Sequence, residues 1–274
     1  MAALADKVAI VTGSGRGIGR AIALKLAGAG AAIVVNDLDE EPAAETMALI
    51  AAAGGRAVAC TGDVVAPDFG DRIVDAALAG LGGLDIIVNN AGYIWNTTIQ
   101  RNTDEQWQAM LDVHATAPFR ILRAASEHFR HSAKREAAAG GVVQRKVVNI
   151  SSVSGMYGSA TQVAYSAGKM AVVGMTHTLA KEWGRYGVNV NAVAFGFIET
   201  RLTQAFEGQP AEIEVKGEHY KVGFPSAAVE DLNKRISLGR PGQVEEAAGA
   251  VYLLCLPEAD YITGQVLICD GGRL

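Results

Sequence analysis

The chain has 274 residues, of which 50% are hydrophobic and 19% charged, and this composition excludes an intrinsically disordered protein. Its formal net charge of −5 at pH 7 argues against the basic surface that binding to nucleic acid or an anionic membrane requires. The first residues lack the pattern of a signal peptide, and no apolar run approaches the roughly 20 residues of a membrane span. Cys60, Cys255 and Cys269 are far apart and match neither a disulfide framework nor a zinc site. We therefore expect a cytoplasmic protein that holds no metal and acts on a small molecule.

Short β-branched runs alternate along the chain with segments of helical periodicity. The expected strands are 8–13, 31–37, 56–60, 84–90, 146–151 and 188–195, and helical patterns follow them, as in 18–26 and 40–53. Nearly continuous apolar strands separated by helices indicate a parallel sheet that is covered on both faces. The expected fold is therefore α/β, a single doubly wound domain over 1–274.

Two segments interrupt this alternation. The charged segment 131–146 is expected to be a surface loop. The longer segment 202–237 contains Glu, Lys and two prolines. Long irregular insertions in α/β domains often gate ligands, so we expect this segment to be a lid over the substrate.

A glycine-rich turn, TGSGRGIG from Thr12 to Gly19, follows the first expected strand. Glycines allow a tight turn and a close approach to a pyrophosphate, and a helix that begins near Gly17 offers free N–H groups. By itself the pattern also fits an ordinary turn between a strand and a helix. Its position between the first strand and the first helix favours a dinucleotide site.

Asp37 stands at the end of the second expected strand. A carboxylate at this place binds the ribose hydroxyls of NAD and repels the additional phosphate of NADP. Asn36 and Asp39 are rival candidates for the role, Arg16 could reach a 2′-phosphate, and Asp37 can also simply close a strand. The balance favours NAD over NADP.

Two further polar clusters follow expected strands, Asp63 with Val64 and the run Asn89-Asn90-Ala91-Gly92. Ligands of open α/β sheets bind at the carboxyl ends of the strands, where these clusters lie. Each cluster alone also fits a turn, because Asn and Asp tolerate left-handed backbone geometry.

Ser152, Tyr165 and Lys169 form the most specific chemical pattern. Tyr165 and Lys169 are four residues apart on an expected helix, so their side chains share a face. A nearby ammonium favours the phenolate, so we expect Lys169 to lower the pKa of Tyr165 toward a value useful for general acid and base catalysis. Ser152, just after a strand, would hold the reacting oxygen. In isolation the Tyr and Lys also fit a solvated helix face.

Taken together and in this order, the motifs resemble the short-chain dehydrogenase/reductase family. The resemblance rests on TGSGRGIG, Asp63, NNAG, Ser152 ahead of YSAGK, and the closing TGQVLICDGG, and it runs nearly the whole length of the chain. The tail is most similar to those of 3-oxoacyl-acyl-carrier-protein reductases and secondary-alcohol dehydrogenases. The resemblance implies a seven-stranded Rossmann sheet, an NAD(P)(H) cofactor and a catalytic set of Ser152, Tyr165 and Lys169.

The same resemblance implies a set of cofactor-binding residues. The set is Thr12, Gly13, Ser14, Arg16, Gly17, Ile18, Gly19, Asp37, Asp63, Val64, Asn90, Ala91, Gly92, Tyr165, Lys169, Gly196, Ile198 and Thr200. Asp63 and Val64 would hold the adenine, Asn90 the ribose, and Ile198 with Thr200 the nicotinamide amide. The resemblance also implies a homotetramer built partly from the helices that start near Asp104 and Gln162.

Two positions depart from the family pattern. His114 stands where relatives carry an Asn that helps to hold a water on the proton path from the lysine. His114 can hold this water through a ring nitrogen and add a titration near pH ~6.5, or it can be a packed histidine bonded to a backbone carbonyl. Phe195 precedes Gly196 where proline is common, and it would slightly alter the nicotinamide loop or simply pack.

The residues expected around the substrate are mostly apolar, namely Trp95, Met156, Tyr157, Gln162, Phe197, Tyr220 and Phe224. Such walls suit a moderately hydrophobic carbonyl or alcohol, although each residue is also a candidate for core or lid packing. We expect reversible hydride transfer between NAD(H) and a secondary alcohol or ketone, including a 3-oxoacyl thioester. The alternatives are an epimerase or dehydratase that retains the cofactor, and a cofactor-binding regulatory or scaffold protein.

Overall fold

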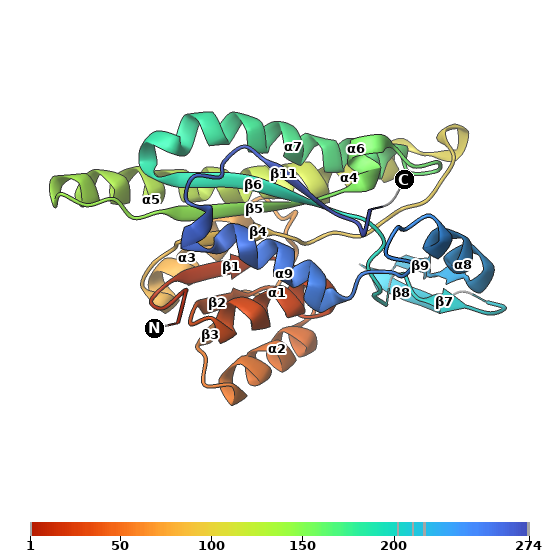
Figure 1. Ribbon diagram of the computed structural model, residues 1–274, viewed down its shortest axis with the longest axis horizontal. Coiled ribbons are helices and arrows are strands. Elements are labelled where there is room, and N and C mark those ends of the chain that lie inside the picture. Colours follow the sequence, from red (N-terminus) through yellow and green to blue (C-terminus); the bar gives the residue numbers. More distant parts are fainter. Residues whose placement is uncertain (1, 202, 210, 216–217, 273–274) are drawn as a thin grey trace.

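A seven-stranded parallel sheet forms the centre of the molecule (Figure 1). The computed structural model describes residues 2–201, 203–209, 211–215 and 218–272, without the side chains of 211–215 and 218–221. The strands are β1 (Val8–Val11), β2 (Ala32–Val35), β3 (Ala57–Ala59), β4 (Ile86–Asn89), β5 (Arg145–Ser152), β6 (Val188–Phe195) and β11 (Val266–Cys269). They lie in the order β11-β6-β5-β4-β1-β2-β3, and neighbouring strands are parallel. The expected doubly wound α/β fold is confirmed.

Helices cover both faces of the sheet, as its nearly continuous apolar strands require. One face carries α1 (Gly17–Gly28), α2 (Glu40–Ala52) and α9 (Val244–Cys255), and the other carries α3 (Phe69–Leu81), α5 (Ala117–Ala138) and α7 (Val163–Trp183). Ile22 and Val251 are buried in the first layer. In the second, the rings of Phe129 and Trp183 meet edge to face at 5.6 Å. The two layers hold the sheet from both sides and leave its carboxyl end for ligands.

Two shorter helices flank α7 near the carboxyl end of the sheet. Helix α4 (Asp104–Leu111) begins with a capping box between Thr103 and Gln106 and packs against α7. A π-helical turn, η2 (Asp112–Thr116), joins α4 to α5. Helix α6 (Val153–Tyr157) follows β5 directly. Single 3₁₀ turns complete the connections at η1 (Ile99–Arg101), η3 (Gly184–Tyr186) and η4 (Pro257–Ala259).

The expectation of a surface loop over 131–146 is wrong for most of that segment. Helix α5 continues to Ala138, and β5 begins at Arg145, so only a short turn lies between them. Ala, Lys, Arg and Glu, which make up 133–138, are good helix formers, and Ser132 is buried, so the helix continues through this stretch. Arg145, although charged, is buried because its guanidinium bonds to the Glu136 carboxylate at 2.5 Å.

The segment 202–237 contains regular structure rather than one irregular loop. Its elements are β7 (Ala205–Phe206), β8 (Ala211–Val215), β9 (Glu218–Val222), β10 (Phe224–Pro225) and α8 (Ser226–Lys234), with β8 and β9 forming an antiparallel hairpin. These elements lie together at the right of Figure 1, beyond the carboxyl ends of the strands. Their position is compatible with a lid, and the role itself stays a prediction.

Candidate functional site

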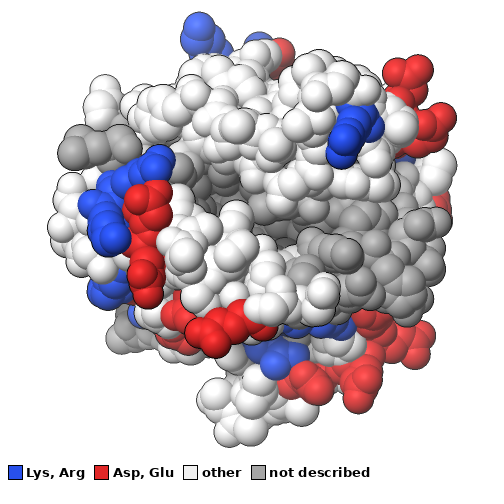
Figure 2. Space-filling model, turned by 90° about the vertical axis from the view of Figure 1, so that its right-hand side faces the viewer, with Lys and Arg blue, Asp and Glu red and all other residues white. Residues whose placement is uncertain are grey.

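A large cavity of about 1860 Å³ opens at the carboxyl end of the sheet. Figure 2 shows this side of the molecule, which is hollowed near its centre. Most of the expected site residues line the cavity, namely Gly13, Arg16, Gly17, Ile18, Gly19, Asp37, Asp63, Val64, Asn90, Ala91, Gly92, His114, Ser152, Tyr165, Gly196, Ile198 and Thr200. The fold thus brings together motifs that lie far apart in the sequence.

The glycine-rich turn forms one end of the cavity. Gly13 and Gly17 have φ angles of +62° and +55°, a left-handed geometry that strongly favours glycine. Helix α1 begins at Gly17, and its first turn contains no acidic residue and no side-chain cap. Its free N–H groups therefore remain available to an anion, as a pyrophosphate site requires.

Thr12 and Ser14 belong to this turn but do not line the cavity, contrary to the expectation of direct contact. The Thr12 hydroxyl accepts hydrogen bonds from the backbone N–H groups of Asn90 and Ala91 at 2.9 and 3.0 Å. The Ser14 hydroxyl donates to the Val11 carbonyl at 2.7 Å. Both side chains point into the protein because they satisfy buried backbone groups. These side chains hold the turn against the strands, and a contact of either residue with the cofactor stays a prediction.

Asp37 lies at the end of β2 and is held by two backbone donors. The N–H of Gly15 donates to Asp37 Oδ2 at 3.2 Å, and the N–H of Asp39 donates to Oδ1 at 3.3 Å. Arg16 bonds to Asp39 at 2.8 Å and lies 3.9 Å from Asp37. Asn36, the rival candidate, is 1% exposed, and its side chain accepts the N–H of Gly13 and donates to the Cys60 carbonyl. Asp37 is thus the carboxylate that the fold fixes at the rim of the cavity.

The Asn90 side chain joins two loops beside the cavity, and its expected contact with the ribose stays a prediction. Its Nδ2 donates to the backbone carbonyls of Thr12 and Gly13 at 2.9 and 3.2 Å, which ties the loop after β4 to the glycine-rich turn. Only its remaining surface faces the cavity. Asp63 accepts the backbone N–H of Val65 at 3.1 Å and also lines the cavity.

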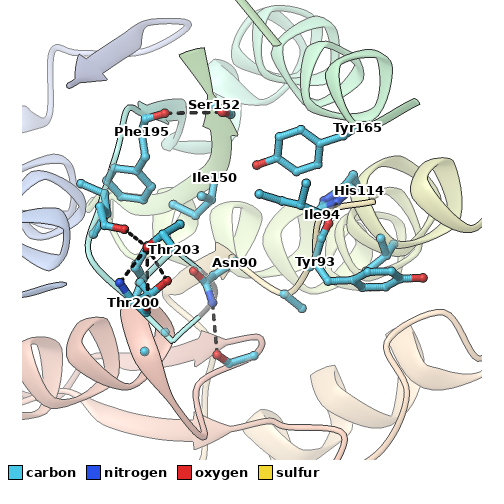
Figure 3. A pocket seen from close by; sticks show the side chains of 18 of the residues that line it. Asn90, Tyr93, Ile94, His114, Ile150, Ser152, Tyr165, Phe195, Thr200 and Thr203 are labelled. Atoms are coloured by element: carbon cyan, nitrogen blue, oxygen red, sulfur yellow. Dashed lines mark hydrogen bonds between the residues drawn. The ribbon is translucent and has the colours of Figure 1, made fainter. Parts of the chain in front are cut away.

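Ser152 and Tyr165 meet at the deep end of the cavity, from β5 and α7 (Figure 3). The Ser152 hydroxyl donates to the Phe195 carbonyl at 3.5 Å and accepts the N–H of Ser154 at 3.2 Å. The 3.5 Å bond is long, so the hydroxyl can turn to another acceptor at little cost. Burial raises the pKa of Tyr165 to about 12, although hydrogen bonding by Ser152 lowers it in part.

Lys169 lies behind Tyr165 and does not line the cavity. Its ammonium nitrogen donates to the Ile150 carbonyl at 2.8 Å and is 5.8 Å from the centroid of the Tyr165 ring. Burial lowers the pKa of Lys169 to about 7. The expectation that Lys169 lowers the pKa of Tyr165 is therefore wrong, because desolvation outweighs the charge of a lysine that is itself close to losing its proton.

This burial predicts a pH dependence of stability in the cofactor-free protein. The pKa of Lys169 is lower in the folded state than in the unfolded state, so the unfolded chain binds more protons above pH 7 and folding is favoured as the pH rises. In Lys169→Met this contribution is absent. Between pH 7 and 10, the free energy of unfolding of the unmutated protein should rise by up to about 3 kcal/mol relative to the variant. Urea titrations at several pH values measure the free energy of unfolding of both proteins, with the exposed Lys181→Met as control. If this free energy changed equally with pH in the unmutated protein and in Lys169→Met, the prediction would be contradicted.

His114 is 2% exposed and lies on the π-helical turn beside Tyr165. Its Nε2 bonds to the Tyr93 carbonyl at 2.8 Å, its Nδ1 is buried without a partner among the described residues, and its ring meets the Tyr165 ring edge to face at 5.0 Å. Gly92 and Gly168 make room for the His114 side chain, since a Cβ on Gly92 would overlap its ring and one on Gly168 would overlap its Cβ. The bond from Nε2 to the Tyr93 carbonyl agrees with a packed histidine. The unpartnered Nδ1 agrees with a histidine that holds a water.

The expected titration of His114 near pH ~6.5 does not fit the structure. Burial lowers the pKa of His114 well below its usual value, the charge of Lys169 lowers it further, and the bond to Tyr93 offsets this only in part. The ring is therefore neutral at physiological pH. Because Nε2 faces a carbonyl, it carries the hydrogen, and Nδ1 is an acceptor.

The expected substrate-side residues divide into two groups. Gln162, Phe197 and Phe224 line the cavity, and the two Phe rings meet edge to face at 5.7 Å. Trp95, Met156 and Tyr157 do not line it, since Trp95 packs against the core and Tyr157 is 70% exposed. The side chain of Tyr220 lies outside the described residues.

Sequence reasoning missed a polar wall of the cavity. Asp104, Gln108 and Asp112 follow one another at intervals of four residues along α4 and η2, and they line the cavity together with Asn96. The spacing places them on one helix face and was a detectable signal. The cavity is therefore more polar than the expected apolar walls.

The described part of the chain contains no helix long and apolar enough to cross a membrane. It also contains no group of three or more His, Cys, Asp or Glu side chains that could hold a metal ion. The described cysteines, Cys60, Cys255 and Cys269, are free thiols.

Comparison with known proteins identifies the family and the fold of this chain. The family model of the short chain dehydrogenases matches residues 7–211. A 3-oxoacyl-[acyl-carrier-protein] reductase of Synechocystis is 38% identical over 100% of this chain and 99% of its own, and an L-2,3-butanediol dehydrogenase of Corynebacterium glutamicum is 36% identical over 98% and 99%. The crystal structure of a dehydrogenase/reductase from Sinorhizobium meliloti superimposes with a TM-score of 0.82 at 31% identity, covering 98% of this chain and 96% of that one. The chain therefore belongs to the short chain dehydrogenase family, and it is an oxidoreductase that works with a nicotinamide cofactor.

Proposed function

We propose that this enzyme transfers a hydride reversibly between NAD(H) and a secondary alcohol or ketone. The observation that carries the proposal is one continuous cavity with the glycine-rich turn and Asp37 at one end and Ser152 with Tyr165 at the other. The names of similar proteins offer two substrate classes, acyl thioesters and a vicinal diol. Neither the epimerase or dehydratase alternative nor the scaffold alternative is favoured by these relatives.

The residues of the cavity fit a nicotinamide dinucleotide. The uncapped N-terminus of α1 offers N–H groups to a pyrophosphate, and the left-handed Gly13 and Gly17 keep the turn free of side chains. Asp37 would hold the adenine ribose and Asp63 with Val64 the adenine. Ile198 and Thr200, on the loop after β6, would hold the nicotinamide amide, and a bond between the Thr200 and Thr203 hydroxyls at 3.1 Å orders this loop.

Proton transfer takes place at the end of the cavity where Ser152 and Tyr165 lie. The cofactor supplies the hydride acceptor in oxidation and the hydride donor in reduction. In oxidation, Tyr165 Oη accepts the proton of the substrate hydroxyl, and in reduction it returns that proton to the carbonyl oxygen. Ser152 turns its weakly held hydroxyl toward the same oxygen and fixes its position.

Lys169 and His114 support Tyr165 from the protein side. Lys169 keeps its ammonium on the Ile150 carbonyl behind Tyr165, and from there the charged form of the lysine favours the Tyr165 phenolate. His114 Nδ1 would accept a hydrogen bond from a water on the path that replaces the proton. We regard Tyr165 and Ser152 as catalytic and His114 as a positioning residue.

The test of this function is the absorbance of NADH in the presence of a panel of ketones and alcohols. Ketones should oxidise NADH, and secondary alcohols should reduce NAD⁺. Cofactor binding without turnover of any panel member would instead support the scaffold alternative.

NAD preference is a separate prediction. NAD should bind at least several-fold more tightly than NADP, because the fixed Asp37 carboxylate repels the 2′-phosphate and Arg16 is bonded to Asp39. Asp37→Ala should narrow this gap, whereas the exposed Asp75→Ala should leave it unchanged. Fluorescence titration with both reduced cofactors measures the ratio. A preference of the unmutated enzyme for NADP would show that Asp37 does not select NAD.

Assembly, domain organisation and location are further proposals. Trp107, Phe119, Val163 and Met170 are exposed on α4, α5 and α7, where a homotetramer would bury them. Light scattering of the purified protein measures the assembly. We propose that the chain acts as one domain with the segment 202–237 as its lid, and the free thiols favour the cytoplasm.

A further inference from the structure

The loop after β3 brings Asp63, Val64 and Val65 to the wall of the cavity. At the start of this loop, the N–H of Gly62 donates to the Asp37 carbonyl at 3.0 Å. Within the loop, Asp63 Oδ1 accepts the N–H of Val65 at 3.1 Å. Such a local turn sets the shape of the loop, but its far end, at the Val65 carbonyl, has to be placed by contacts from elsewhere.

Arg120 of α5 binds this far end of the loop. Its Nη1 donates to the Val65 carbonyl at 2.6 Å, across 55 positions in the sequence. Arg120 is half-buried, and its guanidinium makes no other hydrogen bond and no ion pair within the described part of the chain. A charged donor forms a stronger hydrogen bond to a carbonyl than a neutral donor does. The charge of Arg120 is therefore used on the loop and not on a carboxylate.

The backbone that carries Arg120 is itself held close to α3. A Cβ on Gly70 would lie 2.7 Å from the Arg120 carbonyl oxygen, so only glycine allows the two helices to approach this closely. The next residues in each helix, Phe69 and Ile121, are buried in the same apolar cluster. Close-packed interiors resist displacement, so the guanidinium extends from a fixed point in the helical layer.

We infer that Arg120 is a positioning residue for the adenine end of the cofactor. The inference rests on the proposed function, in which Asp63 and Val64 hold the adenine. Arg120 is not among the residues that line the cavity, so it acts through Val65 and does not touch the cofactor. By fixing the loop in advance, it removes the entropy cost of ordering Asp63 and Val64 when the cofactor binds.

The first experiment uses Arg120→Met, which keeps an extended side chain but removes the donors. The dissociation constant of NADH, measured by fluorescence titration, should rise about tenfold, as the loss of one charge-assisted hydrogen bond predicts. KM for NADH should rise by the same factor, while kcat changes by less than about twofold. Arg120→Lys, which keeps a charged donor, should bind NADH more tightly than Arg120→Met. Arg123→Met, an exposed position on the same helix, is the matched control and should leave the dissociation constant unchanged.

Cofactor fragments separate this positioning role from a general loss of structure. ADP-ribose keeps the adenine, so its dissociation constant, measured by calorimetry, should also rise about tenfold in Arg120→Met. Reduced nicotinamide mononucleotide lacks the adenosine half, so kcat/KM for this fragment should change by less than about twofold. Equal losses for the two fragments would mean that Arg120 only supports the fold and would overturn the inference.

Asp63→Ala tests the proposed adenine site separately. If Asp63→Ala weakens the binding of ADP-ribose but Arg120→Met does not, the inference is overturned and the proposed adenine site stands. If Asp63→Ala leaves the binding of ADP-ribose unchanged, the proposed adenine site is wrong and the inference fails with it. Absence of turnover with every ketone, while Arg120→Met still weakens ADP-ribose and NADH about equally, would overturn the proposed hydride transfer alone.

Discussion

Tyr165→Phe is expected to lower kcat by about 10²- to 10⁴-fold in both directions, while NADH still binds. The phenyl ring keeps the packing against His114, but the hydroxyl that carries the transferred proton is gone. Stopped-flow measurement of NADH oxidation gives kcat, and fluorescence titration gives the dissociation constant, which should change by less than about twofold.

Tyr157→Phe is the matched control for this prediction. Tyr157 is exposed on α6, does not line the cavity, and loses the same atom in the substitution. Its kcat should equal that of the unmutated enzyme. Substantial ketone reduction by Tyr165→Phe would mean that another group is the general acid.

His114→Ala should lower the free energy of unfolding by about 2 to 4 kcal/mol. The substitution leaves a void between Gly92 and Gly168 and removes the hydrogen-bond partner of the Tyr93 carbonyl. If Nδ1 holds the relay water, kcat should also fall about tenfold, the effect of one lost hydrogen bond on the proton path. His114→Asn, which retains an acceptor, should keep most of the activity. Urea unfolding and steady-state kinetics of both variants measure these effects.

The pH dependence separates the two roles of His114. Its pKa is lowered in the folded state, so the unfolded chain binds an additional proton below about pH 6.5 and the folded protein loses stability as the pH falls. This loss should be smaller in His114→Asn. The kcat profile, by contrast, should show no inflection near pH ~6.5, because the buried ring stays neutral. A His114→Ala variant with undiminished turnover would show that the residue only packs.

The fold was largely predictable from local pattern. Runs such as 188–195 are nearly all apolar, and only a strand covered on both faces buries such a run. Positive φ angles at Gly13 and Gly17 were likewise implied by their place in the turn. The segment 131–138 differs from the expected surface loop because helix propensity and the bond between Glu136 and Arg145 keep its charged residues in an ordered helix.

The candidate site residues could also be predicted from the sequence. Asp37 and Ser152 stand at the ends of strands, and Tyr165 lies on a helix. What each one does was decided by tertiary structure. Burial, which no local pattern reveals, raises the pKa of Tyr165, lowers those of Lys169 and His114, and turns Thr12 away from the cavity. Strand and helix patterns depend on neighbours in sequence, whereas desolvation and hydrogen-bond partners depend on residues that the fold brings together from far along the chain.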